Sequence, residues 1–453
     1  MEFLNTVFYF LILIGVLVFI HELGHFLAAK MFGMRAEVFA LGMGNRVLGW
    51  NTVNNFTWGK LDESVQLGNN TDYRLSAFPV GGYVKIAGMI DESFDTEFIN
   101  KSAEPWEFRS KPVWQRIVVI SAGVIMNIFL AIAIFWGINY VQGESLMQTT
   151  EVGAVMKNSA AEKIGLHAGD KILSINGKKI EHWEIIQSAI YLDNFGKDLS
   201  FTIQRANAET TLFASHASLP DMSEAGFGLI PNFTEAIISD VMKNKPAEKA
   251  GLKPGDVIIS LNATKVFNQE HVIKIVKANP LKPLAIEWKH NGELKSGTVT
   301  PSAEGLIGIA IGSRYNGPTL IVKYGLFESL PHGLKQVESM TKLYAENIWQ
   351  MFTGKVSFTK SVGGPVKIAQ AASRTAEVGI VNFLAFMAVL SISLAVINIL
   401  PFPALDGGHL VILLYEAIFR KPLPQKFQQV VQQIGVALLL GLMVFVLYND
   451  IFG

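Results

Sequence analysis

The sequence predicts an α-helical membrane protein with four transmembrane helices, a membrane-associated β-hairpin and two tandem α+β domains outside the cytoplasm. Half of the 453 residues are apolar and only 17% are charged, which is more apolar than a typical soluble enzyme. Four segments are long and apolar enough to cross a bilayer, which takes about 20 residues. The region between the second and third of these segments contains an internal repeat.

The composition excludes several classes of function. Formal net charge is zero and the chain has no basic tract, so nucleic acid is excluded as a partner. The chain has no cysteine, which excludes disulfides, thiolate metal ligands and cysteine nucleophiles. Its start, MEFLN, carries no basic residue, so we expect the first apolar segment to be retained as a transmembrane helix and not cleaved as a signal peptide.

The apolar segments predict transmembrane helices at residues 1–32, 113–141, 379–409 and 428–449. Basic residues gather after the first helix, before the second, and between the third and fourth: they are Lys30, Arg35, Arg109, Lys111, Arg116, Arg420, Lys421 and Lys426. Lysine and arginine near helix ends favour the cytoplasmic side. Both chain termini and the region between the second and third helices are therefore expected outside the cytoplasm.

The repeat lies in this extracytoplasmic region. VMKNSAAEKIGLHAGDKILSIN begins at Val155, and VMKNKPAEKAGLKPGDVIISLN begins at Val241. Each copy has a short helix pattern ending at Gly-Leu, a Gly-Asp turn and an apolar strand. We expect domains at residues 142–226 and 227–315. They resemble PDZ domains of the bacterial type, which implies binding of extended peptides or chain ends at a sheet edge; a shield or spacer without a ligand is the alternative.

Two other segments have weaker patterns. Within the cytoplasmic-side loop at 33–112, YRLSAFPVGGYVKIAG from Tyr73 predicts strand, turn and strand, and its pattern alone predicts a small cytoplasmic sheet. Residues 316–378 mix apolar and polar positions at helical spacing. We expect an amphipathic connector there, on the membrane surface or against the tandem domains.

The motif HELGH lies inside the first apolar segment. His21 and His25 are four residues apart, so on a helix they lie on one face, close enough to share a metal ion. Glu22 is offset by about 100°, where it can act as the general base of a metalloprotease. Ionisable residues inside a membrane helix indicate function by default.

A catalytic zinc needs three protein ligands and one open position. The next acidic residue, Glu37, lies beyond the first helix, so the third ligand is expected from another segment. The third apolar segment ends in NILPFPALDGGHL, and Asp406, His409 and, further on, Glu416 are the candidates. Spacing favours Asp406 over His409 and leaves both open.

HELGH and NILPFPALDGG, with four membrane helices and the two PDZ-like domains, resemble the site-2 protease family of intramembrane zinc metalloproteases. This resemblance covers essentially the whole chain. It implies one Zn²⁺ per chain held by His21, His25 and Asp406, with Glu22 as general base. It also implies that Asn398 is a polar group near the substrate backbone or the developing oxyanion.

The same resemblance assigns substrate-binding residues. It implies that Gly81, Gly82 and Tyr83 belong to a membrane-reentrant β-hairpin that pairs with an unwound substrate segment. In AGVIMN, the chain has Val124 where the family often has proline, and it keeps Asn127 as a further substrate-binding candidate.

The resemblance also implies a biological role. The location would be the bacterial inner membrane, with termini and PDZ domains in the periplasm. The enzyme would cleave the transmembrane segment of single-span proteins in an envelope stress response. The expected substrate is an anti-sigma factor already trimmed on its extracytoplasmic side, with remnant signal peptides as a further class.

Two readings from other classes remain. The chain could be a catalytically inactive membrane adaptor that presents partners through its PDZ domains. It could also be a metal or proton transporter, although such proteins often show inverted repeats of transmembrane helices and the repeat here lies outside the membrane helices. Bound zinc together with proteolysis would discriminate between these readings.

Overall fold

The computed structural model describes residues 2–62, 65, 67–89, 102–194, 197–215, 227–353 and 363–452. The chain forms two compact units. The first, the membrane unit, comprises Met1–Gly143 and Lys323–Gly453, and the second, the repeat unit, comprises Glu144–Val322.

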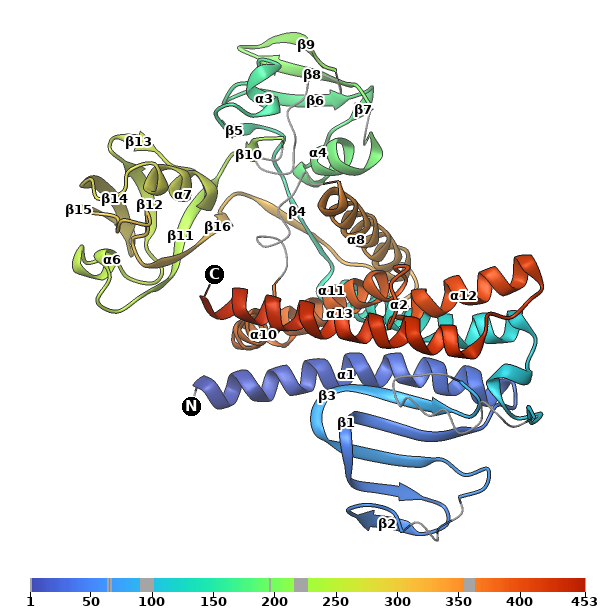
Figure 1. Cartoon of the computed structure of the whole chain (residues 1–453). Helices are drawn as coiled ribbons and strands as arrows, with labels where there is room; N and C mark the ends of the chain where they lie inside the picture. The colour runs from blue at the N-terminus through green and yellow to red at the C-terminus, as the bar shows by residue number, and fades with distance from the viewer. Residues whose placement is uncertain are drawn as a thin grey trace. The chain divides into compact units, whose positions relative to one another are not determined.

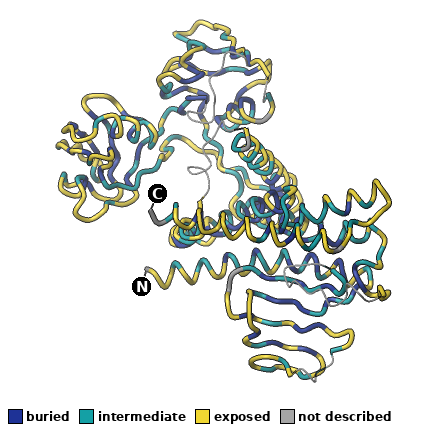
Figure 2. The backbone as a smooth tube through the Cα atoms, viewed as in Figure 1, coloured by how far each residue is buried: buried dark blue, intermediate teal, exposed yellow. Residues whose placement is uncertain are grey.

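Four helices of the described chain are long and apolar enough to cross a membrane. They are α1 (Glu2–Met31), α2 (Val113–Gln142), α11 (Ile380–Asn398) and α13 (Gln425–Phe452) (Figure 1). Large apolar side chains are exposed along α13, for example Leu438, Leu440 and Val444 (Figure 2). Such side chains suit a surface that faces lipid.

The third membrane helix is shorter than the predicted range 379–409. Helix α11 ends at Asn398, and a separate helix, α12 (Asp406–Phe419), begins at the expected ligand. Proline cannot continue a helix because it lacks the N–H donor and its ring clashes with the preceding turn, and Pro401 and Pro403 stand at this break. Gly407 packs directly against the carbonyl groups of Ile399 and Leu400, so the chain folds back tightly there.

The connector at 316–378 contains two amphipathic helices. Helix α8 (Ser329–Phe352) packs against α2 and α11, and Val337 lies in their shared apolar core. Helix α10 (Pro365–Val378) packs with α1 and α11. Because α8 has one apolar face, burying that face on membrane helices removes it from water.

The loop between α1 and α2 forms a sheet from β1 (Ala36–Asn51), β2 (Asn55–Trp58) and β3 (Asp72–Ile86), with a short 3-10 turn at Phe108–Ser110. Both long strands are bent. Leu41 pairs with Gly82 on one side and Leu75 on the other, so the two halves of β3 flank the first half of β1. The predicted hairpin, in which these halves pair with each other, is therefore wrong. The first half of β1 is apolar and mostly buried, which favours the central position.

The repeat unit begins and ends in one ribbon. Strand β4 (Glu144–Met147) pairs antiparallel with β17 (Thr319–Val322). The backbone N–H of Gln148 also donates to the carbonyl of Pro318, at 2.9 Å. The chain thus leaves the membrane unit and returns to it at adjacent positions.

The two copies of the repeat each form a small α+β body with its own apolar core. The first copy contains β5 (Val152–Val155), α3 (Ala160–Lys163), β6 (Lys171–Ile175), β7 (Lys178–Lys179), α4 (Trp183–Ser188), a helical turn at Ala189–Asp193, β8 (Leu199–Arg205), β9 (Ala208–Ala214) and β10 (Leu229–Pro231). The second contains β11 (Thr234–Val241), α6 (Pro246–Lys249), β12 (Val257–Leu261), β13 (Thr264–Lys265), α7 (Gln269–Lys277), β14 (Leu284–His290), β15 (Glu293–Val299) and β16 (Ile309–Tyr315).

The boundary between the copies differs from the predicted 226/227. Strand β10 pairs with β5, and Phe227 lies in the first core. The first body therefore extends to Pro231, because its chain returns to its own first strand. The expected end of the first domain, residues 216–226, lies outside the described residues.

The Gly-Asp turn of each copy has a structural role. The carboxylate of Asp170 receives two hydrogen bonds from Arg205, at 2.6 and 2.7 Å, and Asp256 lies 2.6 Å from Nδ1 of His290. Burial acts to raise the pKa of Asp170, but the hydrogen bonds from Arg205 outweigh it and hold that pKa below its usual range. These buried aspartates are held by partners inside each fold, so neither copy offers them for catalysis.

Candidate active site

Three predicted ligands converge within the membrane unit. His21 and His25 project from one face of α1, and Asp406 is the first residue of α12. Oδ2 of Asp406 lies 3.3 Å from Nε2 of His21 and 3.5 Å from Nε2 of His25. The two Nε2 atoms are 3.3 Å apart. One ligand atom from each residue can therefore face a single point.

This geometry fits a zinc ion. Zinc binds histidine nitrogen at about 2.0–2.1 Å in tetrahedral sites, which places ligand atoms roughly 3.4 Å apart. The buried Oδ2 of Asp406 has no hydrogen-bond donor within the described chain, as expected of an atom that binds a cation. His409 and Glu416 are absent from the cluster of described residues and line a separate pocket. The geometry thus favours Asp406 over His409 as third ligand.

Helix α2 orients both histidines. Nδ1 of His25 lies 2.8 Å from the carbonyl oxygen of Val119, so Nδ1–H donates and Nε2 is left free to bind metal. The side-chain amide of Asn127 lies 3.1 Å from Nδ1 of His21. Ser391 on α11 donates to the backbone carbonyl of Asn127, at 2.8 Å. Asn127 is fully buried beside His21. This position suits a residue that orients His21 as a metal ligand more than one that contacts substrate, which is the role predicted for it.

The predicted base lies beside the cluster and beside the sheet. Glu22 is buried on α1, and the backbone N–H of Val84 on β3 lies close to its carboxylate. A side chain at Gly82 would lie 2.6 Å from Val18 and 2.8 Å from the Ala40 carbonyl oxygen. Glycine at position 82 thus lets the edge of the sheet lie directly on α1, next to Glu22.

The remaining predicted residues occupy different places. Asn398, the last residue of α11, has its Nδ2 3.4 Å from Nε2 of His21, so its amide borders the cluster. Gly81 lies at the bend of β3 with a φ of 77°. Tyr83 points its ring toward the guanidinium of Arg74. The structure brings Asn398 to the cluster and leaves Gly81 and Tyr83 on the sheet beside it.

Sequence reasoning missed the carbonyl of Val119, the contact from Ser391 and the role of Gly123. Gly123 lies directly against the ring nitrogen of His25, and a side chain there would also come within 2.7 Å of His21. Gly24 on α1 lies against the carbonyl of Ala122 in the same way. Small residues allow membrane helices to approach this closely, and a glycine in an apolar helix is the signal that could have indicated such a contact.

Replacing Gly123 with alanine should push the two histidines apart and weaken metal binding roughly tenfold or more, the size of effect seen when groups that orient ligands are disturbed. Gly137→Ala is the matched control, because Gly137 lies on the same helix with no atom within 4 Å of an added Cβ. Metal content and affinity, measured on purified protein with a competing chelator, check this. Equal affinity in the two variants would contradict the assigned contact.

Comparison with known proteins identifies the family. Residues 9–442 match the model of peptidase family M50. The chain is 32% identical to the regulator of sigma E protease of Haemophilus influenzae over 465 residues, 99% of each chain. It is 31% identical to a putative zinc metalloprotease of Pasteurella multocida over 99% of each chain, and 31% identical to the regulator of sigma-E protease of Escherichia coli over 97% of each. These matches confirm the resemblance to site-2 proteases: the chain belongs to peptidase family M50 and is an intramembrane zinc metalloprotease.

Proposed function

We propose that the protein is an inner-membrane endopeptidase that cleaves the transmembrane segment of single-span membrane proteins, with zinc held by His21, His25 and Asp406. The observation that carries this proposal is the convergence of three ligand atoms within 3.5 Å beside a buried glutamate. When bound, zinc supplies Lewis acidity that polarises a carbonyl and acidifies water.

The chain's own residues supply the proton transfers and the oxyanion contact. Glu22 takes the proton from the attacking water as the peptide carbon is attacked, and then passes it to the leaving amine. The side-chain amide of Asn398, beside His21, donates to the oxygen on which negative charge develops. Turned so that its Oδ1, which has no other partner in the described chain, accepts from Nδ1–H, the amide of Asn127 leaves Nε2 of His21 for the metal.

A substrate helix hides its peptide bonds in its own hydrogen bonds, and breaking them in lipid costs several kcal/mol for each unsatisfied group. The half of β3 that runs from Gly82 to Ile86 pairs with β1 on one side only. We infer that the N–H of Val84, which lies close to the carboxylate of Glu22, points away from β1. A substrate strand added at this edge would regain backbone hydrogen bonds next to the base.

The proposed orientation places the termini and the repeat unit in the periplasm. The basic residues near the helix ends support it, and relatives are named regulators of sigma E protease. The proposed substrate is an anti-sigma factor already trimmed on its periplasmic side, with remnant signal peptides as a second class, in an envelope stress response. The two PDZ-like bodies would exclude substrates that still carry bulky outer domains.

The role of Glu22 is tested by Glu22→Gln, which keeps the shape of the side chain but removes the base. Zinc should remain near one per chain, and cleavage of a single-span model substrate should fall about 10²- to 10⁴-fold. Bound zinc and cleavage are measured on the same purified samples in bilayers. If wild type holds zinc and cleaves none of several single-span substrates, the adaptor or transporter reading replaces the protease.

The sheet edge is tested at Val84, because any change at Gly82 would also disturb packing on α1. Val84→Pro removes one outward N–H from an edge strand, where proline is tolerated. Cleavage of a stably helical substrate should fall about tenfold more than cleavage of one carrying helix-breaking residues, since an unmade buried hydrogen bond costs roughly 1–3 kcal/mol. Any effect of the variant on Glu22 itself reduces cleavage of both substrates equally. An equal loss of cleavage for the helical and the helix-broken substrate would therefore exclude strand addition.

The size-exclusion role is tested by deleting residues 149–317 and joining the ends through a short glycine-serine linker. The ends are adjacent because Gln148 and Pro318 are hydrogen-bonded, so the β4–β17 ribbon is retained. The deleted protein should cleave untrimmed substrate as fast as trimmed substrate, while wild type cleaves only the trimmed form. A variant that holds one zinc per chain and still requires trimming would refute the role.

A further inference from the structure

Helix α12 carries Asp406 at its first residue, yet little apolar packing fixes its direction. Among its described residues only Gly407 and Leu413 are buried. Val411 is 48% exposed, Leu414 51% and Ile418 73%. A ligand at the end of such a helix needs another contact to hold it in place.

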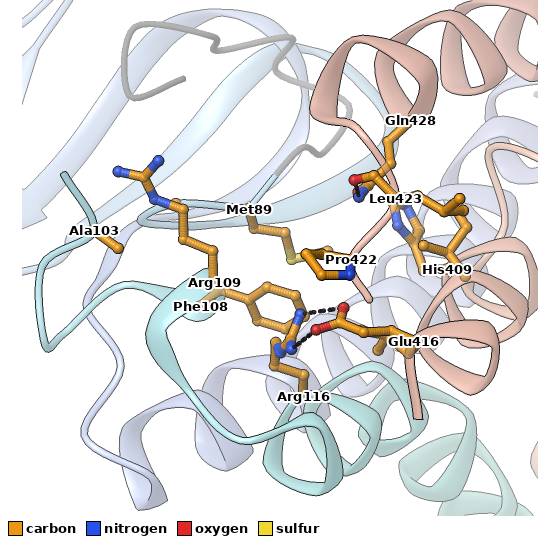
Figure 3. A pocket seen from close by; sticks show the side chains of 13 residues that line it. Met89, Ala103, Phe108, Arg109, Arg116, His409, Glu416, Pro422, Leu423 and Gln428 are labelled. Carbon is orange, nitrogen blue, oxygen red and sulfur yellow. Dashed lines mark hydrogen bonds and ion pairs between the residues drawn. The ribbon is translucent and has the colours of Figure 1, made fainter. Parts of the chain in front are cut away.

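A pocket of about 260 Å³ lies between α12, the start of α2 and the segment before α13 (Figure 3). Phe108, Arg116, His409 and Glu416 are among the residues that line it. Leu413 of α12 lies in one apolar cluster with Val119 and Ile120 of α2. Three residues further along α12, a polar contact joins the two helices.

That contact is a buried ion pair. Arg116 Nη1 lies 3.0 Å from Glu416 Oε2, and Nη2 lies 2.6 Å from Oε1 (Figure 3). The two side chains are only 11% and 13% exposed. Arg116 also donates through Nε to the carbonyl of Lys111, at 3.0 Å. Two parallel hydrogen bonds fix both distance and angle, so the pair defines how α12 lies on α2.

Both ends of this pair are connected to the metal cluster. On α2, Arg116 comes three residues before Val119, whose carbonyl orients His25, and seven before Gly123. Residues at these spacings share one face of a helix. On α12, Glu416 lies ten residues beyond Asp406, roughly 15 Å along the axis. A small change in the angle of α12 at Glu416 therefore moves Asp406 relative to the histidines.

We propose that Arg116 and Glu416 are positioning residues, which set the angle of α12 on α2 and thereby hold Asp406 at the two histidines. This inference rests on the proposed ligand set and goes beyond it, because neither residue touches metal or substrate. An ion pair that only stabilised the fold would be replaceable by apolar residues. A positioning pair would not be, because apolar side chains in its place would pack with a different geometry and change the angle between the two helices.

The test compares Glu416→Gln with the double variant Arg116→Met/Glu416→Leu in the full-length protein. Glu416→Gln leaves a buried cation without its partner, so it should reduce both folding and zinc affinity. The double variant removes both charges and should fold normally, as judged by circular dichroism and resistance to proteolysis. Its affinity for zinc, measured against a chelator, should still be about 10- to 100-fold weaker than that of wild type.

Lys342→Met is the matched control, because it breaks an exposed ion pair with Glu338 in the same unit, where the side chains are 69% and 64% exposed. It should change neither folding nor zinc affinity. A double variant with wild-type zinc affinity would overturn the positioning role and leave the ligand set intact. Failure of the wild type to bind more zinc than His25→Ala would instead refute the ligand set itself.

Discussion

Three atoms with lone pairs, on side chains at most 15% exposed, converge within 3.5 Å of one another between membrane helices, and the rest of the membrane unit depends on this constraint. Outside water, each polar atom that lacks a partner costs several kcal/mol. Helix α2 provides the partners of both histidines through Val119 and Asn127, and Gly123 leaves room for the rings. The cluster is therefore possible because α2 lies directly beside α1.

The break between α11 and α12 follows from the same constraint. One helix can direct two ligands four residues apart at a metal, but a third must approach from another direction. The chain achieves this by ending α11 at Asn398 and starting α12 at Asp406. Carbonyl groups exposed by such a break are tolerated in a membrane only inside protein. Gly407 packs directly on two of them, so the broken segment is covered by its own next helix.

The sequence predicted what depends on local spacing and missed what depends on distant packing. The cluster formed by His21, Glu22 and His25 follows from the period of one helix, and the membrane helices follow from length and hydropathy. The choice of Asp406 over His409 depends on how α12 turns after the proline break, which spacing alone leaves open. The sequence predicted strands in the loop. It did not predict that the first half of β1 lies between the two halves of β3, because pairing between distant segments has no local signal.

Asn127 illustrates the same limit for a single residue. A polar side chain in an apolar helix indicated function, and the structure places it at the cluster. The sequence could not show whether it faces His21 or the space for a substrate, since this depends on the rotation of α2 against α1. The contact of Gly24 with Ala122 and of Gly123 with the histidines fixes that rotation.

Under the proposed strand addition, the contact between the sheet edge and α1 limits which bonds the enzyme can cleave. Gly82 lies against Val18 and the N–H of Val84 lies close to Glu22, so the edge and the base are next to each other. A peptide that pairs along this edge has its bonds beside Glu22 held at fixed spacing from the metal ligands. A segment that stays helical cannot pair there, because its backbone donors and acceptors are already satisfied. If the substrate binds by the proposed strand addition, its unwinding is a requirement for cleavage, and the sequence of a membrane span can decide whether it is cleaved.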